Sequence, residues 1–437
     1  MLTRAPAALL SLAPSLASLA LHAAPAAAQV AVRADTLHTM GPAGTLSDAV
    51  VICTDGKITA IGPAASTPIP AGLPVLRAKV ATPGLIDARS TVGLSGLFNQ
   101  RQDSDQLETS AAIQPELRAL DAYNPREKLI DWVRSFGVTT IHTGHAPGEL
   151  ISGQTIVVKT TGNTVADALL KDPAAVVCTI GPDAHRPGGN PGTRGKEMAM
   201  LRDAFIKARE YQERRDRDAK KAADAKPAPA DTTPTPSPAE KPADKPLPSD
   251  RNLRHEILAR VLSGEVPLIV TAHKAQDLDT ALRLRDEFPS IRLWLDGAAE
   301  AFLMIDRIKA AGVPVIIHPT MMRAFGQAEN LSFETASKLV AAGIPVSLQA
   351  GYEGYVPKTR VVLLEAALLA ANGLSFTQAL ETITIAPARL LGLADRLGSL
   401  ETGKDADLAL YDGDPFEYTS HCTATIINGS PAFEGKR

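Results

Sequence analysis

Short apolar runs that alternate with turns occupy both ends of the chain. Near the N-terminus, residues 49–53 and 57–62 are rich in Val and Ile, and the Asp55-Gly56 pair between them is a typical hairpin turn. Similar runs recur near the C-terminus at residues 407–411 and 423–427, and an Asn-Gly turn follows the last of them. The pattern predicts one β-domain that is assembled from the two ends of the chain.

The middle of the chain alternates between helical and strand-like patterns. After residue 250, four helices each lead into an apolar strand, the helices at residues 252–262, 277–287, 298–310 and 333–342 and the strands at 266–271, 291–295, 313–317 and 345–348. Earlier elements are helices at 128–136 and 197–209 and strands at 138–141 and 155–158. Repeated strand and helix units predict an α/β fold with a parallel sheet, and periodicity leaves its closure undecided.

One internal segment has a different composition from its surroundings. Residues 222–250, which follow a charged helical stretch at 213–221, consist largely of Pro, Ala, Asp and Lys. Such a segment has too little apolar area to offset the entropy that ordering costs. We interpret it as a flexible loop inserted between units of the α/β region, and a Pro-rich docking arm is the alternative.

The length and charge of the chain narrow the classes of partner. The 437 residues suffice for a large domain plus a smaller one, and the net charge of −3 gives no basic excess. We therefore expect no nucleic-acid partner, and a small-molecule or protein partner instead. The three cysteines are too widely spaced for a zinc cluster or a disulfide framework, so we interpret them as buried apolar residues, and a single disulfide in an oxidising compartment is the alternative.

The first 28 residues have the features of a secretory signal. Arg4 is followed by an apolar stretch at residues 5–21, and three alanines precede Gln29. Pro14 interrupts the apolar run, which argues against an uncleaved membrane anchor. We predict a cleaved signal peptide over residues 1–28 and a secreted chain, periplasmic if the source is bacterial, with no membrane span after cleavage.

Several motifs resemble the amidohydrolase superfamily, in particular its imidazolonepropionase-like branch of metal-dependent C–N bond hydrolases. The motifs are Pro-Gly-Leu-Ile-Asp at 83–87, Gly-Val-Thr-Thr at 137–140, Gly-Thr-Arg-Gly at 192–195, Ala-Pro-Ala-Arg at 386–389, and the stretches 114–124 and 398–407. The resemblance implies a (β/α)8 TIM-type barrel over residues 83–394. It also implies a small β-sandwich built from residues 29–82 and 395–437.

The resemblance also implies where the catalytic metal would be held. In that family, histidines of strands 1, 5 and 6 and an aspartate of strand 8 ligate the metal, which activates water. The corresponding positions in this chain carry residues that bind metal poorly: Ala88, Ser90, Thr271, Gly297 and Gly351. We therefore expect no metal cofactor and predict a degenerate, non-catalytic member of the family.

The alternative is a relocated metal site that binds zinc or another divalent metal. It would use His142, His145, His273 and His318, with Asp296 or Glu353 as the carboxylate. Lys159 matches a bridging lysine of some relatives, although a solvated lysine at a strand end is the simpler interpretation. Arg89 would place a permanent positive charge beside the former metal position and favour an anionic ligand.

These observations define two functional hypotheses. In the first, the chain is an exported amidohydrolase-fold protein without metal chemistry. It would then be a ligand-binding paralogue or the subunit of a hetero-oligomer with an intact amidohydrolase. In the second, it is an active hydrolase of non-peptide C–N bonds that uses the relocated histidines. The sequence contains no Gly-x-Ser-x-Gly elbow to suggest a serine hydrolase.

Overall fold

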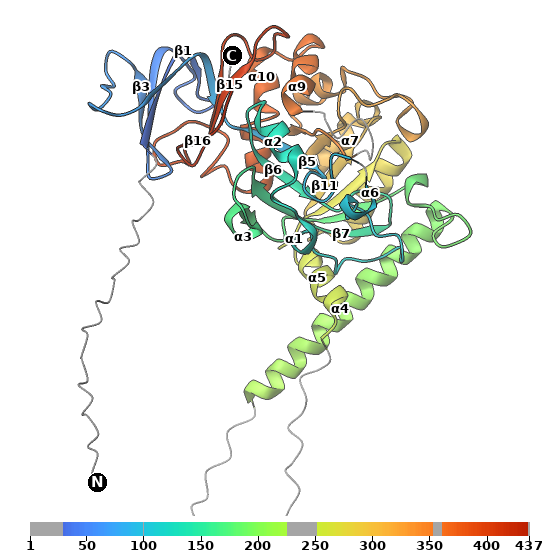
Figure 1. Ribbon diagram of the computed structural model, residues 1–437. Helices are drawn as coiled ribbons and strands as arrows, with labels where there is room; N and C mark the ends of the chain where they lie inside the picture. The colour runs from blue at the N-terminus through green and yellow to red at the C-terminus, as the bar shows by residue number, and fades with distance from the viewer. Residues whose placement is uncertain (1–28, 99, 225–250, 353–360, 436–437) are drawn as a thin grey trace, which may run out of the picture.

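The computed structural model describes residues 29–98, 100–224, 251–352 and 361–435, and it contains a barrel and a separate sheet (Figure 1). The predicted signal peptide, Glu353, and all but the first three residues of the predicted insert lie outside these ranges. Within them, no helix is both long enough and apolar enough to cross a bilayer. Cys53 and Cys178 are buried, as predicted, whereas Cys422 is only partly buried.

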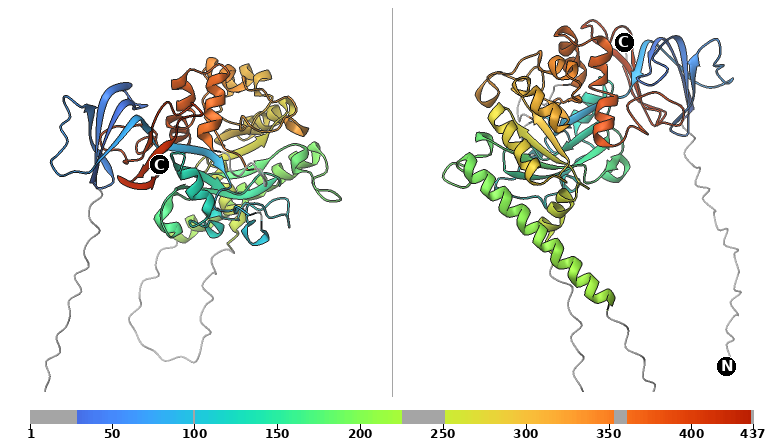
Figure 2. Two further views of the ribbon diagram at one scale, coloured as in Figure 1. Left: turned by 45° about the horizontal axis from the view of Figure 1, so that its top comes forward. Right: turned by 180° about the vertical axis from the view of Figure 1, so that it is seen from behind.

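The separate sheet combines strands from both ends of the chain, which confirms the predicted β-domain (Figure 2). Its strands are β1 (Gln29–His38), β2 (Thr45–Thr54), β3 (Lys57–Pro63), β4 (Val75–Pro83), β14 (Leu408–Tyr411), β15 (Cys422–Ile427) and β16 (Ser430–Glu434). Their order is β16-β15-β14-β4-β1-β2-β3. All seven strands form one continuous hydrogen-bonded sheet, because β4 pairs with β1 on one side and with β14 on the other.

The hairpin turns of this sheet follow from their residue types. Asp55 and Gly56 have φ angles of 51° and 77°, and Asn428 and Gly429 have φ angles of 51° and 73°. Left-handed conformations at both central residues define the turn that matches the twist of two-residue hairpins, and Asn, Asp and Gly adopt them readily. These turns therefore fix the pairing of β2 with β3 and of β15 with β16.

Eight strands form a nearly closed barrel, so the structure resolves the question of closure that periodicity left undecided. They are β5 (Leu85–Ser90), β6 (Val138–Gly144), β7 (Ile151–Lys159), β9 (Val176–Thr179), β10 (Leu268–Ala272), β11 (Leu293–Gly297), β12 (Val315–Ile317) and β13 (Val346–Leu348). The short β8 (Leu169–Lys171) pairs with β7 alone. A parallel bridge between Ser90 and Gly351 joins the first barrel strand to the last.

One barrel strand differs from the predicted all-parallel arrangement. Strand β7 runs antiparallel to both of its neighbours, β6 and β9. Only residues 145–150 separate β6 from β7. A parallel crossover needs a dozen or more residues, so this short connection forces the chain to turn back.

Helices surround the barrel and connect its strands. The longer ones are α2 (Lys128–Arg134), α4 (Arg194–Asp224), α5 (Leu253–Leu262), α6 (Ala275–Glu287), α7 (Ile305–Ala311), α8 (Thr335–Ala341), α9 (Val362–Ala371), α10 (Phe376–Glu381) and α11 (Ile385–Leu391). Single turns are α1 (Ala119–Ala122), α3 (Val165–Ala168), η1 (Arg101–Asp103), η2 (Pro182–Ala184), η3 (Ala301–Leu303) and η4 (Gly326–Ala328). The helix predicted at 298–310 starts later, because Ala298 has a left-handed φ of 49°, and it is split into η3 and α7 at Met304, whose φ of −122° and ψ of 16° are not helical.

The two helical stretches predicted at 197–209 and 213–221 form one 31-residue helix, α4. Its first half packs on the barrel and on α5 through Leu201, Phe205 and Ala208, which are all buried. At 1.5 Å per residue, a helix of this length spans roughly 46 Å. Its second half therefore projects beyond the barrel (Figure 1).

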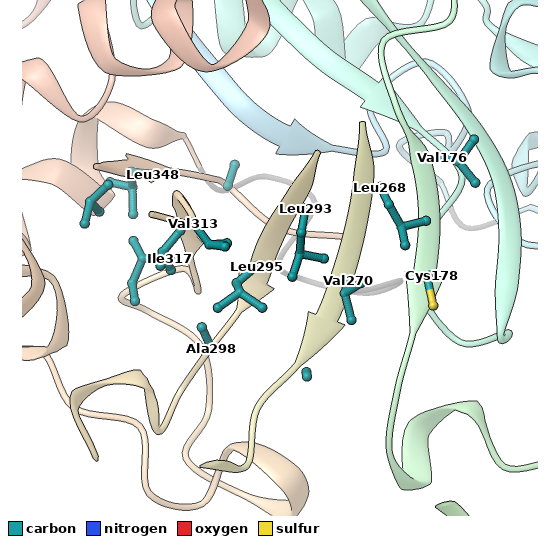
Figure 3. Close-up of a cluster of buried hydrophobic side chains, with 14 of the residues drawn as sticks. Val176, Cys178, Leu268, Val270, Leu293, Leu295, Ala298, Val313, Ile317 and Leu348 are labelled. Carbon is teal, nitrogen blue, oxygen red and sulfur yellow. The ribbon is translucent and has the colours of Figure 1, made fainter. Parts of the chain in front are cut away.

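Alternation along the barrel strands separates two packing layers. Residues such as Val176, Val270 and Leu295 face outward and pack beneath the helices (Figure 3). Residues between them, such as Ile269 and Trp294, face the barrel interior. Because side chains alternate with a period of two, Thr271 and Asp296 also face the interior, one step nearer the C-terminal ends of the strands.

Candidate functional site

A polar layer crosses the barrel interior above the apolar layer of Ile269 and Trp294. The Asp296 carboxylate is fully buried and accepts two hydrogen bonds of 2.6 Å. One comes from Thr271 Oγ1 of the neighbouring strand β10, and the other from Gln349 Nε2, just after β13. Asp296 thus links three positions around the barrel.

Arg89, at the end of β5, is the largest fully buried side chain in the described part of the molecule. Its guanidinium donates to the backbone oxygens of Ser90, at 3.2 Å, and His145, and it lies 5.9 Å from the centre of the Tyr352 ring. Its Nε has no partner among the described residues. Burial lowers the pKa of Arg89, while attraction from Asp296 opposes that effect.

Asp87, on the first barrel strand, forms a hydrogen bond to a residue that follows the last barrel strand. Its Oδ1 accepts hydrogen bonds of 3.1 Å from the backbone amides of Arg89 and Ala350. Burial raises the pKa of Asp87 to about 7, because desolvation outweighs these two hydrogen bonds. Its carboxyl group therefore holds the start and end of the barrel together at the level of Arg89.

His142, in the second half of β6, and His145, just after this strand, differ in their surroundings. His142 Nδ1 lies 2.7 Å from the Ala88 oxygen and its Nε2 lies 2.7 Å from Thr155 Oγ1, so both ring nitrogens are engaged. The His145 ring packs against Gly153 and lies beside the backbone of Gln106. Burial, reinforced by the charge of Arg89, lowers the pKa of His142 to about 3 and that of His145 to about 4.

His273 and His318 form a second group, after strands β10 and β12. The His273 ring packs over Gly297, whose missing side chain leaves room for it. His318 Nδ1 lies 2.9 Å from the Pro319 oxygen, and its Nε2 has no partner among the described residues. Burial, together with a smaller effect of the neighbouring His273, lowers the pKa of His318 to about 4.

The structure distributes the predicted site residues over separate places. Near the centre it gathers Arg89, Asp296 and Thr271, with His142 and His145 beside Arg89 and His273 beside His318. Ala88 contributes only its carbonyl, the Ser90 hydroxyl accepts from the Val92 amide, and Gly351 pairs with Ser90. Within the described ranges, no three His, Cys, Asp or Glu side chains are arranged to hold a metal ion.

Lys159 is at the other end of the barrel, so both predictions for it are wrong. Because β7 is antiparallel, its last residue lies beside the start of β6, opposite Thr140. Lys159 is buried there, and its Nζ lies 2.9 Å from Asp405 Oδ2 and 3.0 Å from Asp407 Oδ2. It is therefore neither a solvated lysine nor part of the central polar layer.

Sequence reasoning missed Gln349, Thr155 and Tyr352 as parts of the site. Gln349 follows the buried Leu348, and alternation alone would have indicated that it faces the interior. Thr155 gave no such signal, because its contact with His142 depends on the reversed direction of β7. The contact between Tyr352 and Arg89 joins a residue that follows the last barrel strand to the first strand, so no local sequence pattern indicates it.

Comparisons with known proteins agree with this architecture. Residues 304–433 match the Amidohydro_3 model, described as the amidohydrolase family. The chain is 26% identical over 418 residues to the amidohydrolase tasK of Hapsidospora irregularis, which covers 88% of this chain and 40% of that protein. It is 29% identical over 119 residues to the imidazolonepropionase of Thermoplasma acidophilum, covering 26% of this chain and 28% of that protein.

A solved structure supports the same fold over most of the chain. The amidohydrolase from Thermotoga maritima superposes with a TM-score of 0.82 at 24% identity, covering 93% of this chain and 100% of that one. The chain belongs to the amidohydrolase superfamily, and imidazolonepropionases are among its distant relatives. It spans about two-fifths of the length of tasK.

Proposed function

We propose that this chain is a non-catalytic member of the amidohydrolase superfamily that binds a small anionic ligand beside Arg89. The observation that supports this proposal is the position of the Arg89 guanidinium. It is fully buried at the end of β5, and its Nε has no partner among the described residues. The backbone carbonyl of His145 holds the guanidinium in place. Buried donors of this kind lower the free energy of an anion that reaches them, because charge-assisted hydrogen bonds are the strong ones.

The residues present do not fit the divalent metal that the family implies. A ligating histidine must offer a free ring nitrogen, and both nitrogens of His142 are held by Ala88 and Thr155. The permanent charge of Arg89 would also repel a divalent cation at this level of the barrel. His273 and His318 are neighbours, but the described residues supply no third ligand in position.

The metal content of the purified chain tests the first half of the proposal. We expect substoichiometric zinc and manganese, even when either metal is supplied during expression. Elemental analysis of the wild-type chain and of a His273→Ala/His318→Ala double variant gives the comparison. Stoichiometric metal that the double variant loses would overturn the proposal in favour of a hydrolase with a relocated histidine site.

Anion titration tests the second half. Acetate, benzoate and phosphate are the probes, and calorimetry measures their dissociation constants. Replacing Arg89 by Gln should weaken the tightest of them by roughly tenfold or more, the equivalent of one charge-assisted hydrogen bond. Arg307→Gln, at a half-buried arginine of α7, is the matched control. Equal affinities in wild type and Arg89→Gln would remove Arg89 as the binding group.

A role as a subunit is a second candidate, favoured by the tasK alignment. The matched segment leaves three-fifths of tasK unaligned, which is enough chain for a second unit of this size. We propose that a separate, intact amidohydrolase binds this chain and takes the place of the part of tasK that is not aligned. Co-expression with such a paralogue, followed by size-exclusion chromatography, should give a hetero-oligomer. Independent elution of the two chains at micromolar concentrations would contradict it.

A further inference from the structure

A cavity of about 560 Å³ opens at the end of the barrel opposite Arg89. Its floor is formed where β12 and β13 begin, by Pro314, Pro345 and Val346, whereas Arg89 lies where β5 ends. The walls come from α8, α10 and α11. The volume falls within the range of about 300–1,000 Å³ that is typical of small-molecule sites.

The inner part of this cavity is apolar and contains an aromatic wall. Trp294 of β11 is 5% exposed and lines it together with Val340 and Ile344. The Trp294 ring also contacts His142 edge-on, with 6.2 Å between the ring centres. An indole face and aliphatic side chains favour a flat, apolar group in the interior of the cavity.

The rim of the cavity has two opposite charges. Glu381 ends α10 and Arg389 lies in the last turn of α11, and these are the charged residues that line the cavity. Both are exposed, and neither forms an ion pair with the other or with any further residue in the described part of the chain. A ligand that has both a carboxylate and an ammonium group would complement this rim, whereas a simple anion would also encounter Glu381.

We infer that this cavity binds an α-amino acid with a large apolar side chain. The side chain would lie against Trp294, the carboxylate would bind Arg389 and the ammonium group would bind Glu381. This site is distinct from the proposed anion site, because the apolar layer of the barrel separates it from Arg89. The inference therefore holds or fails independently of the proposed function.

The fluorescence of Trp294 provides a direct measurement. Trp132, on the molecular surface, is the other tryptophan of the chain, so a Trp132→Phe background isolates the signal. The probes are L-phenylalanine, 3-phenylpropionate, which lacks the ammonium group, and 2-phenylethylamine, which lacks the carboxylate. We expect saturable quenching or enhancement by L-phenylalanine, and at least tenfold weaker binding of the other two.

Variants of the rim and wall complete the test. Arg389→Gln and Glu381→Gln should each weaken L-phenylalanine binding at least tenfold, and Val340→Phe should abolish it by filling the cavity. Arg89→Gln should leave it unchanged, which would show that the probe is not bound at the anion site. No change of fluorescence or heat with any probe would overturn the inference. Binding of 3-phenylpropionate as tight as that of L-phenylalanine would overturn the amino-acid assignment.

Discussion

Lys159 Nζ, at the end of barrel strand β7, lies 3.0 Å from Asp407 Oδ2, at the start of the C-terminal part of the sheet. Lys159 also contacts Asp405. Burial alone would raise the pKa of Asp405, but hydrogen bonds from Lys57 and Lys159 lower that pKa to about 2. Asp407 is buried and its pKa is raised by desolvation, even though the charge of Lys159 opposes this. Asp405 is also paired with Lys57 at 2.6 Å and with Arg396 at 2.9 Å, so among these cations Lys159 is the buried charge that faces Asp407 where the barrel meets the sheet.

Removing this lysine should destabilise the protein strongly. We expect Lys159→Met to cost about 3–5 kcal/mol of unfolding free energy, because it leaves Asp407 as an uncompensated buried charge. Urea denaturation followed by circular dichroism measures the change. Lys207→Met, on the surface of α4 beside Asp203, is the matched control and should cost less than about 1 kcal/mol. A loss as small as the control's would show that the buried pair is not required.

The hydrogen bond from Thr271 to Asp296 should contribute measurably to stability. Thr271→Val keeps the shape of the side chain and removes the donor, so we expect a cost of about 1.5–3 kcal/mol for a bond to a buried carboxylate. Thr280→Val removes an exposed hydroxyl on α6 and should change stability by less than about 0.5 kcal/mol. Equal effects in the two variants would contradict the role assigned to the polar layer.

Gly297 should not tolerate a side chain. An added Cβ would lie 2.6 Å from His273 Cε1, and the φ of 76° is left-handed. We expect Gly297→Ala to cost more than Gly326→Ala, which has a similar φ of 61° but no atom within 4 Å of the added Cβ. Backbone strain alone costs about 1–3 kcal/mol, so the difference between the variants in thermal denaturation isolates the steric clash.

Acidification should destabilise the protein through its buried histidines. His142, His145 and His318 have pKa values of about 3, 4 and 4 when folded, below the ordinary histidine value of 6.5. Between about pH 6.5 and 4 these histidines take up protons only when the protein unfolds. Each of them therefore lowers the unfolding free energy of the protein by about 1.4 kcal/mol per pH unit as the pH falls. Asp87, with a folded pKa of about 7, has the opposite effect and offsets one of them.

A histidine substitution measures this effect directly. His318→Gln should reduce the loss of unfolding free energy between pH 6.5 and 5 by about 2 kcal/mol relative to wild type. Gln276→Ala, at an exposed residue of α6 that does not titrate, is the control and should leave the pH profile unchanged. A profile in His318→Gln that parallels the wild type would mean that His318 does not remain neutral in the folded protein.

The sequence by itself determined the elements whose signals are local. Asp55-Gly56 set a hairpin through its own backbone preferences, and the apolar runs at both ends indicated a shared β-domain. The α/β alternation after residue 250 indicated the barrel strands, although several of them begin two residues later than predicted. Motifs such as Pro-Gly-Leu-Ile-Asp then pointed to the superfamily that the comparisons support.

Only the tertiary structure decided which side chains meet. The short connection after β6 reverses β7, which moves Lys159 to the domain boundary and brings Thr155 to His142. The burial of Arg89 depends on the closure of the barrel between β5 and the end of β13. Such contacts join residues that are far apart in the chain, and the periodicity of a single strand contains no information about the direction of its neighbours.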